Sequence, residues 1–409
     1  MKVKFYSFFL LTALLVMTAG CAGDPGNNEN KKRVDIELTR AEQGMVSSNN
    51  RFAFDIYSRI SAEANSAENT VFSPLSLTLL MAMINNGAVG ETQQQIMEPL
   101  GFGDYTADEL NAFYRKMLDA AANLDPKVTV ETANSIWVKN GFPVKPAFVK
   151  LNEESYDAEV KNVDLLNPAT LTAINNWASQ KTHGKIEKIL DEIDPHTVMI
   201  LMNALYFKGS WTDEFDKKST KEEYFTKADG SKVKVKMMKQ TQAAGYTENE
   251  LYSSACLTFG NEAFYMSFIL PNEGITISKV LSGIREECIA GTDLTDMEKV
   301  SFSVPKFSAA FEMQLDKHLK KMGMELPFKG SADFSAMHSS PEPVWISFIK
   351  QKAFIEVDEK GAEAAAVTVG GMVTEAGPRS VSFILDRPFL FMIREASSGA
   401  IYFMGEYNG

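Results

Sequence analysis

The spacing of apolar residues predicts helices in the first half of the chain and strands in the second half. Apolar side chains recur every three to four positions from residue 50, which is the period of a helix. A later apolar run begins after Ser73, carries Pro74 in its first turn and ends at Gly87, which are helix start and stop signals. We expect helices at residues 50–63, 73–88 and 167–186.

Shorter apolar runs in the second half are typical of strands. Some of these runs are apolar throughout, as in strands that are covered on both faces. We expect strands at residues 200–211, 264–271, 299–307, 352–357, 389–393 and 401–407. Helices combined with a large, mainly antiparallel sheet system make the predicted fold class α+β.

The N-terminus has the pattern of a secretion signal. Two lysines precede an apolar run over residues 5–17, which is too short to span a bilayer and ends in small residues. The stretch before Cys21 resembles a bacterial lipobox, so residues 1–20 are predicted to be removed and Cys21 to be lipidated. Thr18 stands where that motif usually has Leu, and secretion with an unmodified Cys21 is the alternative.

The remainder of the chain is predicted to be one domain on a tether. Residues 21–47 contain the lipidated cysteine and a flexible, polar tether, and residues 48–409 form a single domain without a linker or repeat. We expect a secreted protein held at the outer membrane or cell surface, a monomer that contacts membrane only through its lipid anchor.

The charge and the cysteines exclude some functions. The formal net charge is −12, and it becomes −14 when the two lysines of the signal peptide are lost. An acidic chain is unsuited to nucleic acid and to anionic lipid surfaces. Cys256 and Cys288 both lie in apolar segments, which favours buried thiols over a disulfide.

The sequence contains no enzyme signature. It has no G-x-S-x-G, H-E-x-x-H, C-x-x-C, P-loop or G-x-G-x-x-G motif. The four histidines lie in polar or turn-like segments, typical of surface histidines, although a Ser-His-Asp set scattered along the chain stays open. We therefore expect no enzymatic activity, no metal and no cofactor.

Several further motifs stand in a fixed order along the chain. Residues 69–96 contain the N-x-x-x-S-P-x-S helix start and a G-A-x-G-x-T turn, and residues 174–186 are similar to N-x-W-V-x-x-x-T-x-G-x-I. The string LMNALYFKGSWTDEFD at residues 201–216 is close to the most recognisable serpin segment. VPKF, KAFIEVDEKGAEAAA, DRPFLFMI and FMGE follow in the family's order, so the resemblance runs from about residue 48 to the end.

The serpin resemblance implies a three-sheet fold with eight or nine helices and an exposed reactive loop. Serpins inhibit serine or cysteine proteases by offering this loop as bait, and the cleaved loop then enters the central sheet as a new strand with the protease still esterified to it. The implied partners are serine proteases, with elastase-like or subtilisin-like enzymes favoured by the small residues of the loop. A serpin-fold binding or carrier protein is the alternative.

The alanine-rich stretch at residues 356–367 fits such an insertion. In a middle strand every second side chain enters the core, and the inward set from Ala362 onward is small and uncharged. A buried charge there would be costly, whereas Glu363 falls on the opposite face. An alanine-rich helix and a slack surface loop are the other interpretations. The predicted hinge residues are Glu359, Gly361, Ala362, Glu363, Ala364, Ala365, Ala366 and Thr368.

The resemblance also implies a polar cluster beneath the central sheet. Ser73, Ser76 and Asn203 would belong to it together with Gln351, which stands where serpins commonly carry a histidine. Glutamine both donates and accepts hydrogen bonds, but it does not titrate near neutral pH. Trp211 either guards the entry point of the inserting loop or fills core.

Counting along the loop predicts the reactive bond. In serpins the scissile bond usually follows the seventeenth residue, when the glutamate that begins the hinge is counted as the first. Counted from Glu359, the last of these is Glu375, so the first choice is Glu375–Ala376. The alternatives are the bonds Thr374–Glu375 and Val373–Thr374.

Overall fold

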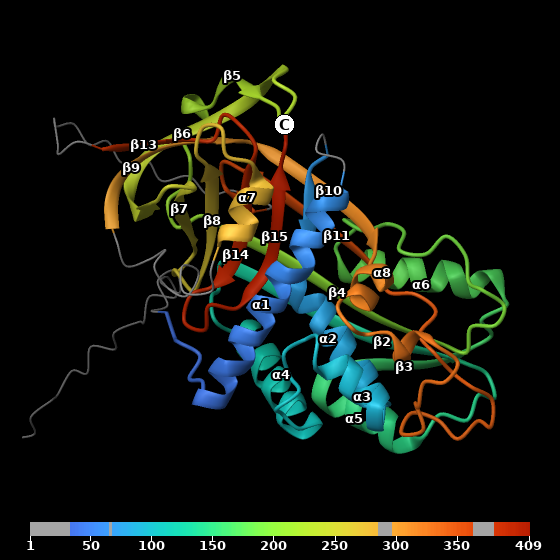
Figure 1. Cartoon of the computed structure of the whole chain (residues 1–409). Coiled ribbons are helices and arrows are strands. Elements are labelled where there is room, and N and C mark those ends of the chain that lie inside the picture. The colour runs from blue at the N-terminus through green and yellow to red at the C-terminus, as the bar shows by residue number, and fades with distance from the viewer. Residues whose placement is uncertain (1–32, 65–67, 285–296, 363–379) are drawn as a thin grey trace, which may run out of the picture.

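The computed structural model describes residues 33–64, 68–284, 297–362 and 380–409 (Figure 1). Eight α-helices lie in these ranges, and the three expected ones are among them, as α1, α2 and α6. The helices are α1 (Arg40–Glu63), α2 (Pro74–Asn85), α3 (Gly90–Met97), α4 (Ala107–Ala121), α5 (Pro146–Tyr156), α6 (Pro168–Lys181), α7 (Ile277–Gly283) and α8 (Asp316–Lys321), with 3-10 turns η1 (Lys217–Ser219) and η4 (Leu326–Phe328).

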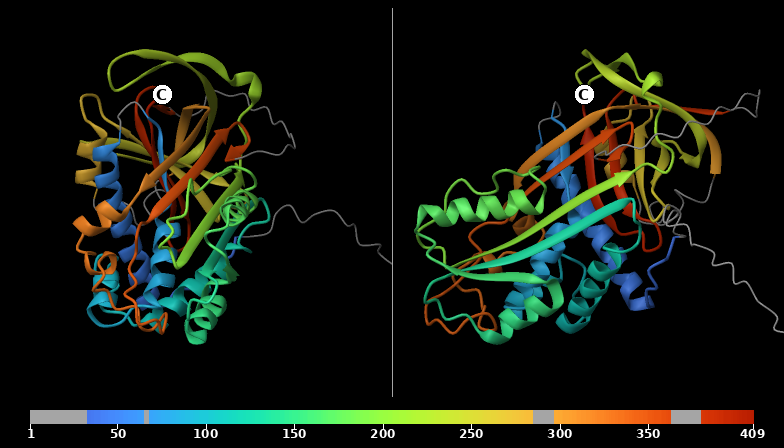
Figure 2. Two further views of the ribbon diagram at one scale, coloured as in Figure 1. Left: turned by 90° about the vertical axis from the view of Figure 1, so that its right-hand side faces the viewer. Right: turned by 180° about the vertical axis from the view of Figure 1, so that it is seen from behind.

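The central sheet has the strand order β10-β11-β12-β4-β2-β3. Its neighbours are antiparallel except for β2 and β3, which are parallel. The strands are β2 (Val128–Lys139), β3 (Ala158–Val163), β4 (Met199–Ser210), β10 (Phe307–Gln314), β11 (Lys350–Asp358) and the two-residue β12 (Gly361–Ala362). Figure 2 shows α6 on the opposite face of this sheet from α1 and α2.

The long strand β6 joins the other two sheets. Its last residues pair with β7 in the sheet β1-β15-β14-β8-β7, and its middle pairs with β9 in the sheet of β5, β6, β9 and β13. These strands are β1 (Thr70–Phe72), β5 (Lys221–Thr226), β6 (Lys232–Glu248), β7 (Tyr252–Phe259), β8 (Phe264–Pro271), β9 (Met297–Pro305), β13 (Val381–Ile384), β14 (Phe389–Glu395) and β15 (Ile401–Tyr407). The predicted α+β fold with three sheets is confirmed.

The core lies where the helices meet β14 and β15. Every residue of these two strands is buried, as expected for strands covered on both faces. Phe52, Ile56 and Ile60 of α1 are buried, which agrees with their helical spacing. Among the described residues, no helix is both long enough and apolar enough to cross a membrane.

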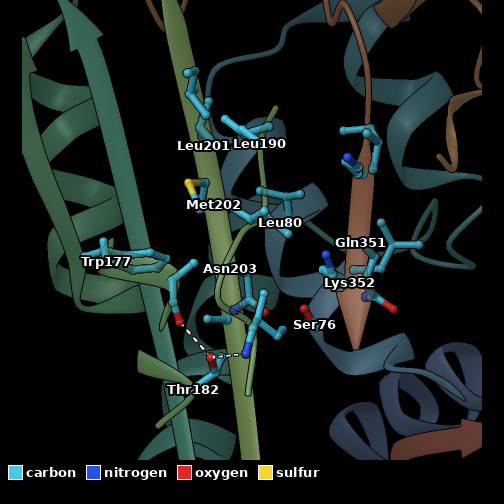
Figure 3. Close-up of a pocket in the computed structure, with 18 of the residues that line it drawn as sticks. Ser76, Leu80, Trp177, Thr182, Leu190, Leu201, Met202, Asn203, Gln351 and Lys352 are labelled. Atoms are coloured by element: carbon cyan, nitrogen blue, oxygen red, sulfur yellow. Dashed lines mark hydrogen bonds between the residues drawn. The ribbon is translucent and has the colours of Figure 1, made fainter. Parts of the chain in front are cut away.

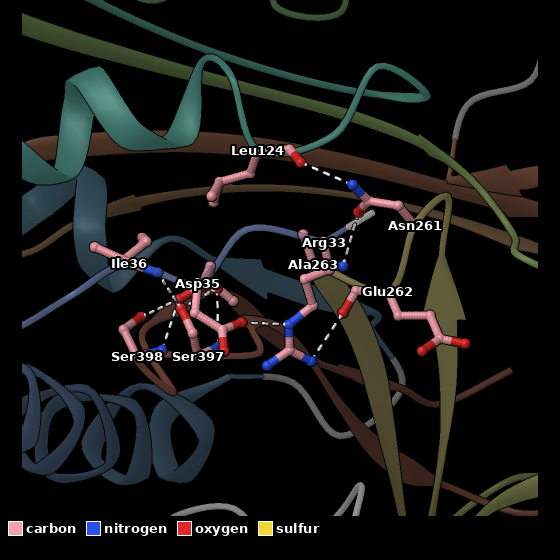
Figure 4. A network of polar contacts seen from close by, with 10 residues as sticks. Arg33, Asp35, Ile36, Leu124, Asn261, Glu262, Ala263, Ser397 and Ser398 are labelled. Atoms are coloured by element: carbon pink, nitrogen blue, oxygen red, sulfur yellow. Dashed lines mark hydrogen bonds and ion pairs between the residues drawn. The ribbon is translucent and has the colours of Figure 1, made fainter. Parts of the chain in front are cut away.

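The ordered domain begins earlier than the expected boundary at Ser48. A capping box starts α1 at Arg40, because Thr39 and Glu42 exchange side-chain to backbone hydrogen bonds. The residues before it lie on the domain (Figure 4), where the Ile36 N–H donates to Ser397 Oγ at 2.8 Å. Residues 33–47 are therefore part of the folded unit rather than of a flexible tether.

Candidate functional site

The two residues of β12 form a wedge between β11 and β4. Ala362 pairs with Val357 of β11 on one side and with Gly209 of β4 on the other, and its side chain is 1 % exposed. Gly361 occupies the next rung, opposite Asp358. Position 362 pairs with strands on both sides and is enclosed by them, so a small side chain fits there.

Gly361 makes a close approach that requires glycine. Its φ is +152°, and a Cβ atom placed on it would lie 1.9 Å from the Gly209 carbonyl oxygen and 2.7 Å from the Ser210 Cα. Any side chain at this position would displace backbone, so glycine is what allows the wedge to enter the sheet here.

Past β12, no strand of the described residues lies between β4 and β11. In the part of the chain that the structure describes, β4 and β11 form no ladder with each other, and their only shared neighbour is β12. A cavity of about 70 Å³ lies along this seam, and a second cavity of about 20 Å³ lies closer to β12. We call the space between β4 and β11 the seam.

The seam passes through the sheet from one face to the other (Figure 3). Ser76 and Leu80 of α2 line the larger cavity on one face, and Trp177 of α6 and Leu190 line it on the other. Apolar side chains form most of its wall, so an apolar segment that filled it would bury little polar surface.

A polar cluster fastens β11 to α2 at the seam. Gln351 Oε1 accepts from the Ser73 N–H at 2.9 Å, and its Nε2 donates to the Ser73 carbonyl at 2.8 Å. Ser73 Oγ donates to the Tyr402 carbonyl at 2.8 Å and accepts from the Ser76 N–H at 3.2 Å, which caps α2. Both bonds of Gln351 go to backbone groups, so they depend on an amide and not on a titrating group.

Asn203 lines the same cavity but has other hydrogen-bond partners. Its Nδ2 donates to Asn134 Oδ1 at 2.7 Å, and Asn134 Nδ2 donates to the Tyr156 carbonyl at 2.7 Å. The structure therefore brings Ser73, Ser76 and Gln351 into one hydrogen-bonded group and ties Asn203 to β2 and the end of α5 instead.

Trp211 holds the end of the seam where β12 enters. Its Nε1 donates to the Asp358 carbonyl at 2.9 Å, and its backbone N–H donates to the Lys360 carbonyl at 2.7 Å. The ring is 2 % exposed and stacks on Phe259 at 4.4 Å between centroids. Trp211 thus packs in the core and also links the end of β4 to the end of β11.

Glu359, at the base of the hinge, is buried and held by two side chains. Oε1 accepts from Thr220 Oγ1 at 3.0 Å, and Oε2 pairs with Lys306 Nζ at 3.0 Å. Burial acts to raise the pKa of Glu359, but the hydrogen bonds from backbone, Lys306 and Thr220 outweigh it and leave the pKa lowered. The carboxylate is therefore charged at neutral pH and fixes the chain just before β12 to Thr220 and Lys306.

The segment after α6 crosses the seam and is tied to β11 by charged groups. We call residues 182–193 the strap. Lys185 Nζ lies 3.2 Å from Glu356 and 4.9 Å from the centre of the Phe354 ring. Asp191 and Lys350 form a second pair at 3.5 Å.

The strap is also tied to the other side of the seam. His183 Nε2 lies 2.8 Å from Glu131 of β2. The strap therefore spans from β2 to β11 over the seam. Sequence reasoning missed it, because ion pairs between distant residues leave no periodic signal.

Two histidines differ from the surface position expected for them. His318 and His338 are buried, and burial lowers the pKa of each. His318 lies 3.5 Å from Glu63 at the end of α1. Among the described ranges, no group of three or more His, Cys, Asp or Glu side chains is arranged as metal ligands. Cys256 is a buried thiol.

Some predicted site residues lie outside the described residues. They are Cys21, Glu363, Ala364, Ala365, Ala366, Thr368, Val373, Thr374, Glu375 and Ala376.

Comparison with protein families gives one match. The family model described as Serpin (serine protease inhibitor) matches residues 47–409. The wheat protein Serpin-Z2A (Triticum aestivum) is 35 % identical over 392 residues, which cover 91 % of this chain and 96 % of that protein. Human Serpin I2 is 32 % identical over 376 residues, covering 90 % of this chain and 92 % of that protein.

Solved structures agree with this match. The thermophilic serpin tengpin in its native state superposes with a TM-score of 0.82 at 28 % identity, over 93 % of this chain and 97 % of that one. Thyroxine-binding globulin in complex with thyroxine has a TM-score of 0.80 at 26 % identity, over 89 % of this chain and 99 % of that one.

Proposed function

Because this chain belongs to the serpin family, we propose that it inhibits serine proteases by inserting its cleaved reactive loop into the seam. The observation that carries the proposal is that Gly361 and Ala362 already form the first two rungs of a strand between β11 and β4. A loop that continued in register would fill the open seam below them.

The chemistry belongs to the protease. Its serine Oγ attacks the carbonyl of the scissile bond, the new amino terminus leaves with a proton, and an ester joins the loop to the protease. Insertion of the loop then carries the esterified protease away from the water and geometry that hydrolysis needs. At about 3.3 Å per strand residue, some fifteen inserted residues span on the order of 50 Å.

The small hinge residues support insertion over a purely binding role. Ala362 is inward and enclosed, and in an inserted strand the alternation would put Ala364, Ala366 and Thr368 on the same face. None carries a charge that burial would penalise. A binding or carrier role is the second candidate, favoured by the likeness to thyroxine-binding globulin.

The target class and location are also part of the proposal. The reactive bond is Glu375–Ala376, which fits a Glu-specific protease, or one of the two bonds before it, which follow Thr374 and Val373 and suit elastase-like or subtilisin-like enzymes. Glu-specific proteases are uncommon, so the elastase-like class is the favoured target. The N-terminal pattern supports secretion and a lipid anchor at Cys21, with the inhibitor acting as a monomer at the cell surface.

An adduct assay with a matched pair of variants tests the proposal. Ala362→Arg places a cation on the inward face, and Glu363→Arg places the same group on the outward face. We expect wild type and Glu363→Arg to give an SDS-stable adduct with an elastase-like or subtilisin-like protease, and Ala362→Arg to be cut without adduct. Undiminished adduct from Ala362→Arg, or none from wild type with any protease that cuts the loop, contradicts insertion.

A further inference from the structure

One hairpin is strongly basic in an otherwise acidic chain. Residues 217–239, which we call the lysine hairpin, contain eight lysines and three carboxylates and so carry a net charge of +5, whereas the whole chain carries −12. The hairpin comprises η1, β5 and the first part of β6. A local charge of the opposite sign indicates a surface that attracts an anionic partner.

The pairing of β5 with β6 sorts these side chains between two faces. Phe225 is buried and its ring lies 5.0 Å from that of Tyr407, so one face of the hairpin packs on the domain. Tyr224 points to the other face, is 61 % exposed and pairs with Lys234 across the strands. The lysines that alternate onto the same face of β6 are Lys232, Lys234 and Lys236, all exposed.

Carboxylates neutralise only part of this charge. Glu222 pairs with Lys234 at 2.6 Å and with Lys236 at 3.9 Å, and Glu223 pairs with Lys239. The other five lysines of the hairpin have no carboxylate at ion-pair distance within the described ranges. These five are Lys217, Lys218, Lys221, Lys227 and Lys232.

The hairpin touches the residues from which the reactive loop departs. Thr220, just before β5, donates to Glu359 at 3.0 Å. The Lys306 N–H donates to the Lys236 carbonyl at 2.7 Å, while Lys306 Nζ binds Glu359. One end of the hairpin is therefore fixed to the hinge.

The hairpin also adjoins the place where the loop returns. Ser301 of β9 donates to Ser380 at 3.0 Å and lies 3.0 Å from Thr241 of β6. The Thr226 N–H, at the end of β5, donates to the Asp386 carbonyl at 2.8 Å, just after β13. Figure 1 shows β5, β6 and β13 together at one end of the molecule.

A protease bound to the loop would therefore lie next to the lysine hairpin. Asp386 lies two residues after β13 ends, so its hydrogen bond with Thr226 places the end of β5 within roughly 7 Å of the end of β13. A protease domain of about 240 residues has a diameter of roughly 45 Å by its radius of gyration. A protease of that size, bound to a loop that begins after Ala362 and ends before Ser380, would therefore reach these lysines.

From this placement we propose that the lysine hairpin is a docking surface for an acidic face next to the active site of the target protease. The inference rests on the proposed function and adds the charge of the partner to it. Complementary charges act mainly by accelerating encounter, by tenfold to a thousandfold in favourable cases. A free polyanion fits less well, because the rest of the chain repels it and Glu222 interrupts the basic face.

Two triple variants of the full chain test this docking surface. Lys218→Gln/Lys221→Gln/Lys232→Gln removes charge from the hairpin. The control, with glutamine at Lys145, Lys150 and Lys329, removes the same charge from exposed positions elsewhere, two of them at α5 at the opposite end of the molecule. The readout is the second-order rate of loop consumption, adduct plus cleaved product, with an acidic and a basic elastase-like protease.

We expect the hairpin variant to react roughly tenfold more slowly than wild type with the acidic protease at low salt. The difference should vanish near 1 M salt, where the screening length is about 3 Å. The control variant and the basic protease should show no such loss. Equal rates for both variants with the acidic protease overturn the proposal. So does a hairpin variant that is slowed as much with the basic protease as with the acidic one. Binding to a sulfated polysaccharide with no change in these rates also overturns it. A failure of inhibition itself is distinct, because it changes the share of adduct and not the rate of consumption.

Discussion

Gly361 lies so close to the backbone of Gly209 that a Cβ atom on it would stand 1.9 Å from the Gly209 carbonyl oxygen. This contact sets the point at which β12 enters the central sheet. It also makes the entry of β12 sensitive to a single methyl group.

Gly361→Ala should expel β12 from the seam. The methyl group meets backbone and not a flexible side chain, so the inserted position is destabilised by about 1–3 kcal/mol. We expect faster hydrogen exchange in peptides covering residues 355–362 and more inhibitor consumed for each protease trapped. Gly330→Ala is the control, because its Cβ would meet only the Trp345 ring at 3.7 Å. Unchanged exchange in Gly361→Ala contradicts this account of the wedge.

Gln351→Met should destabilise the fold while keeping most of the side-chain volume. The Ser73 N–H and carbonyl both lose their partner in a buried position, which costs about 2–4 kcal/mol in total. Denaturant unfolding measures this loss. Gln314→Met, at an exposed position of β10, should stay within about 0.5 kcal/mol of wild type. If Gln351→Met loses no more unfolding free energy than Gln314→Met does, the cluster contributes little to stability.

Glu359 predicts a pH dependence at the hinge. Burial opposes ionisation of Glu359, but its hydrogen bonds and Lys306 lower the pKa overall. A carboxyl with a lowered folded-state pKa stabilises the fold above its unfolded value of about 4.3 and loses that contribution as the pH falls through the folded value. Glu359→Gln should therefore melt below wild type at pH 6–7, and the gap should narrow as the pH falls below the unfolded value. A gap that stays constant across this range would rule out the carboxylate as its source.

The strap should slow insertion through its ion pairs. Lys185→Met removes the pair with Glu356 and the contact with the Phe354 ring. Partly exposed pairs contribute up to about 1 kcal/mol, so loop insertion after cleavage should accelerate by roughly twofold to fivefold. Tryptophan fluorescence can follow it, because Trp177 lines the seam and Trp211 closes its end. Lys150→Met, which breaks an exposed pair on α5, is the control and should leave the rate unchanged. Slower insertion in Lys185→Met contradicts this role.

Local signals in the sequence predicted much of this fold. Ser73 and Pro74 mark the start of α2 because capping acts within one turn. The same kind of signal, Thr39 with Glu42 three residues on, was present at α1 and would have placed its start correctly. The later boundary at Ser48 followed composition instead, which changes more gradually than a cap.

Contacts across the sheet were beyond the reach of the sequence. Asn203 bonds Asn134 because β4 lies beside β2, a pairing that no local pattern encodes. His318 lies in a stretch of charged residues yet is buried, since α8 packs it against the end of α1. The seam itself is a space between two strands, so only the fold reveals it.

The most direct test of loop insertion is the melting temperature of intact protein against protein cut within residues 373–376. The account predicts that the cut protein melts at a higher temperature, because the freed loop continues β12 and fills the seam between β4 and β11. Ala362→Arg, cut in the same way, should show little of this increase. A midpoint for the cut wild-type protein that is equal to or lower than that of the intact protein would contradict the account.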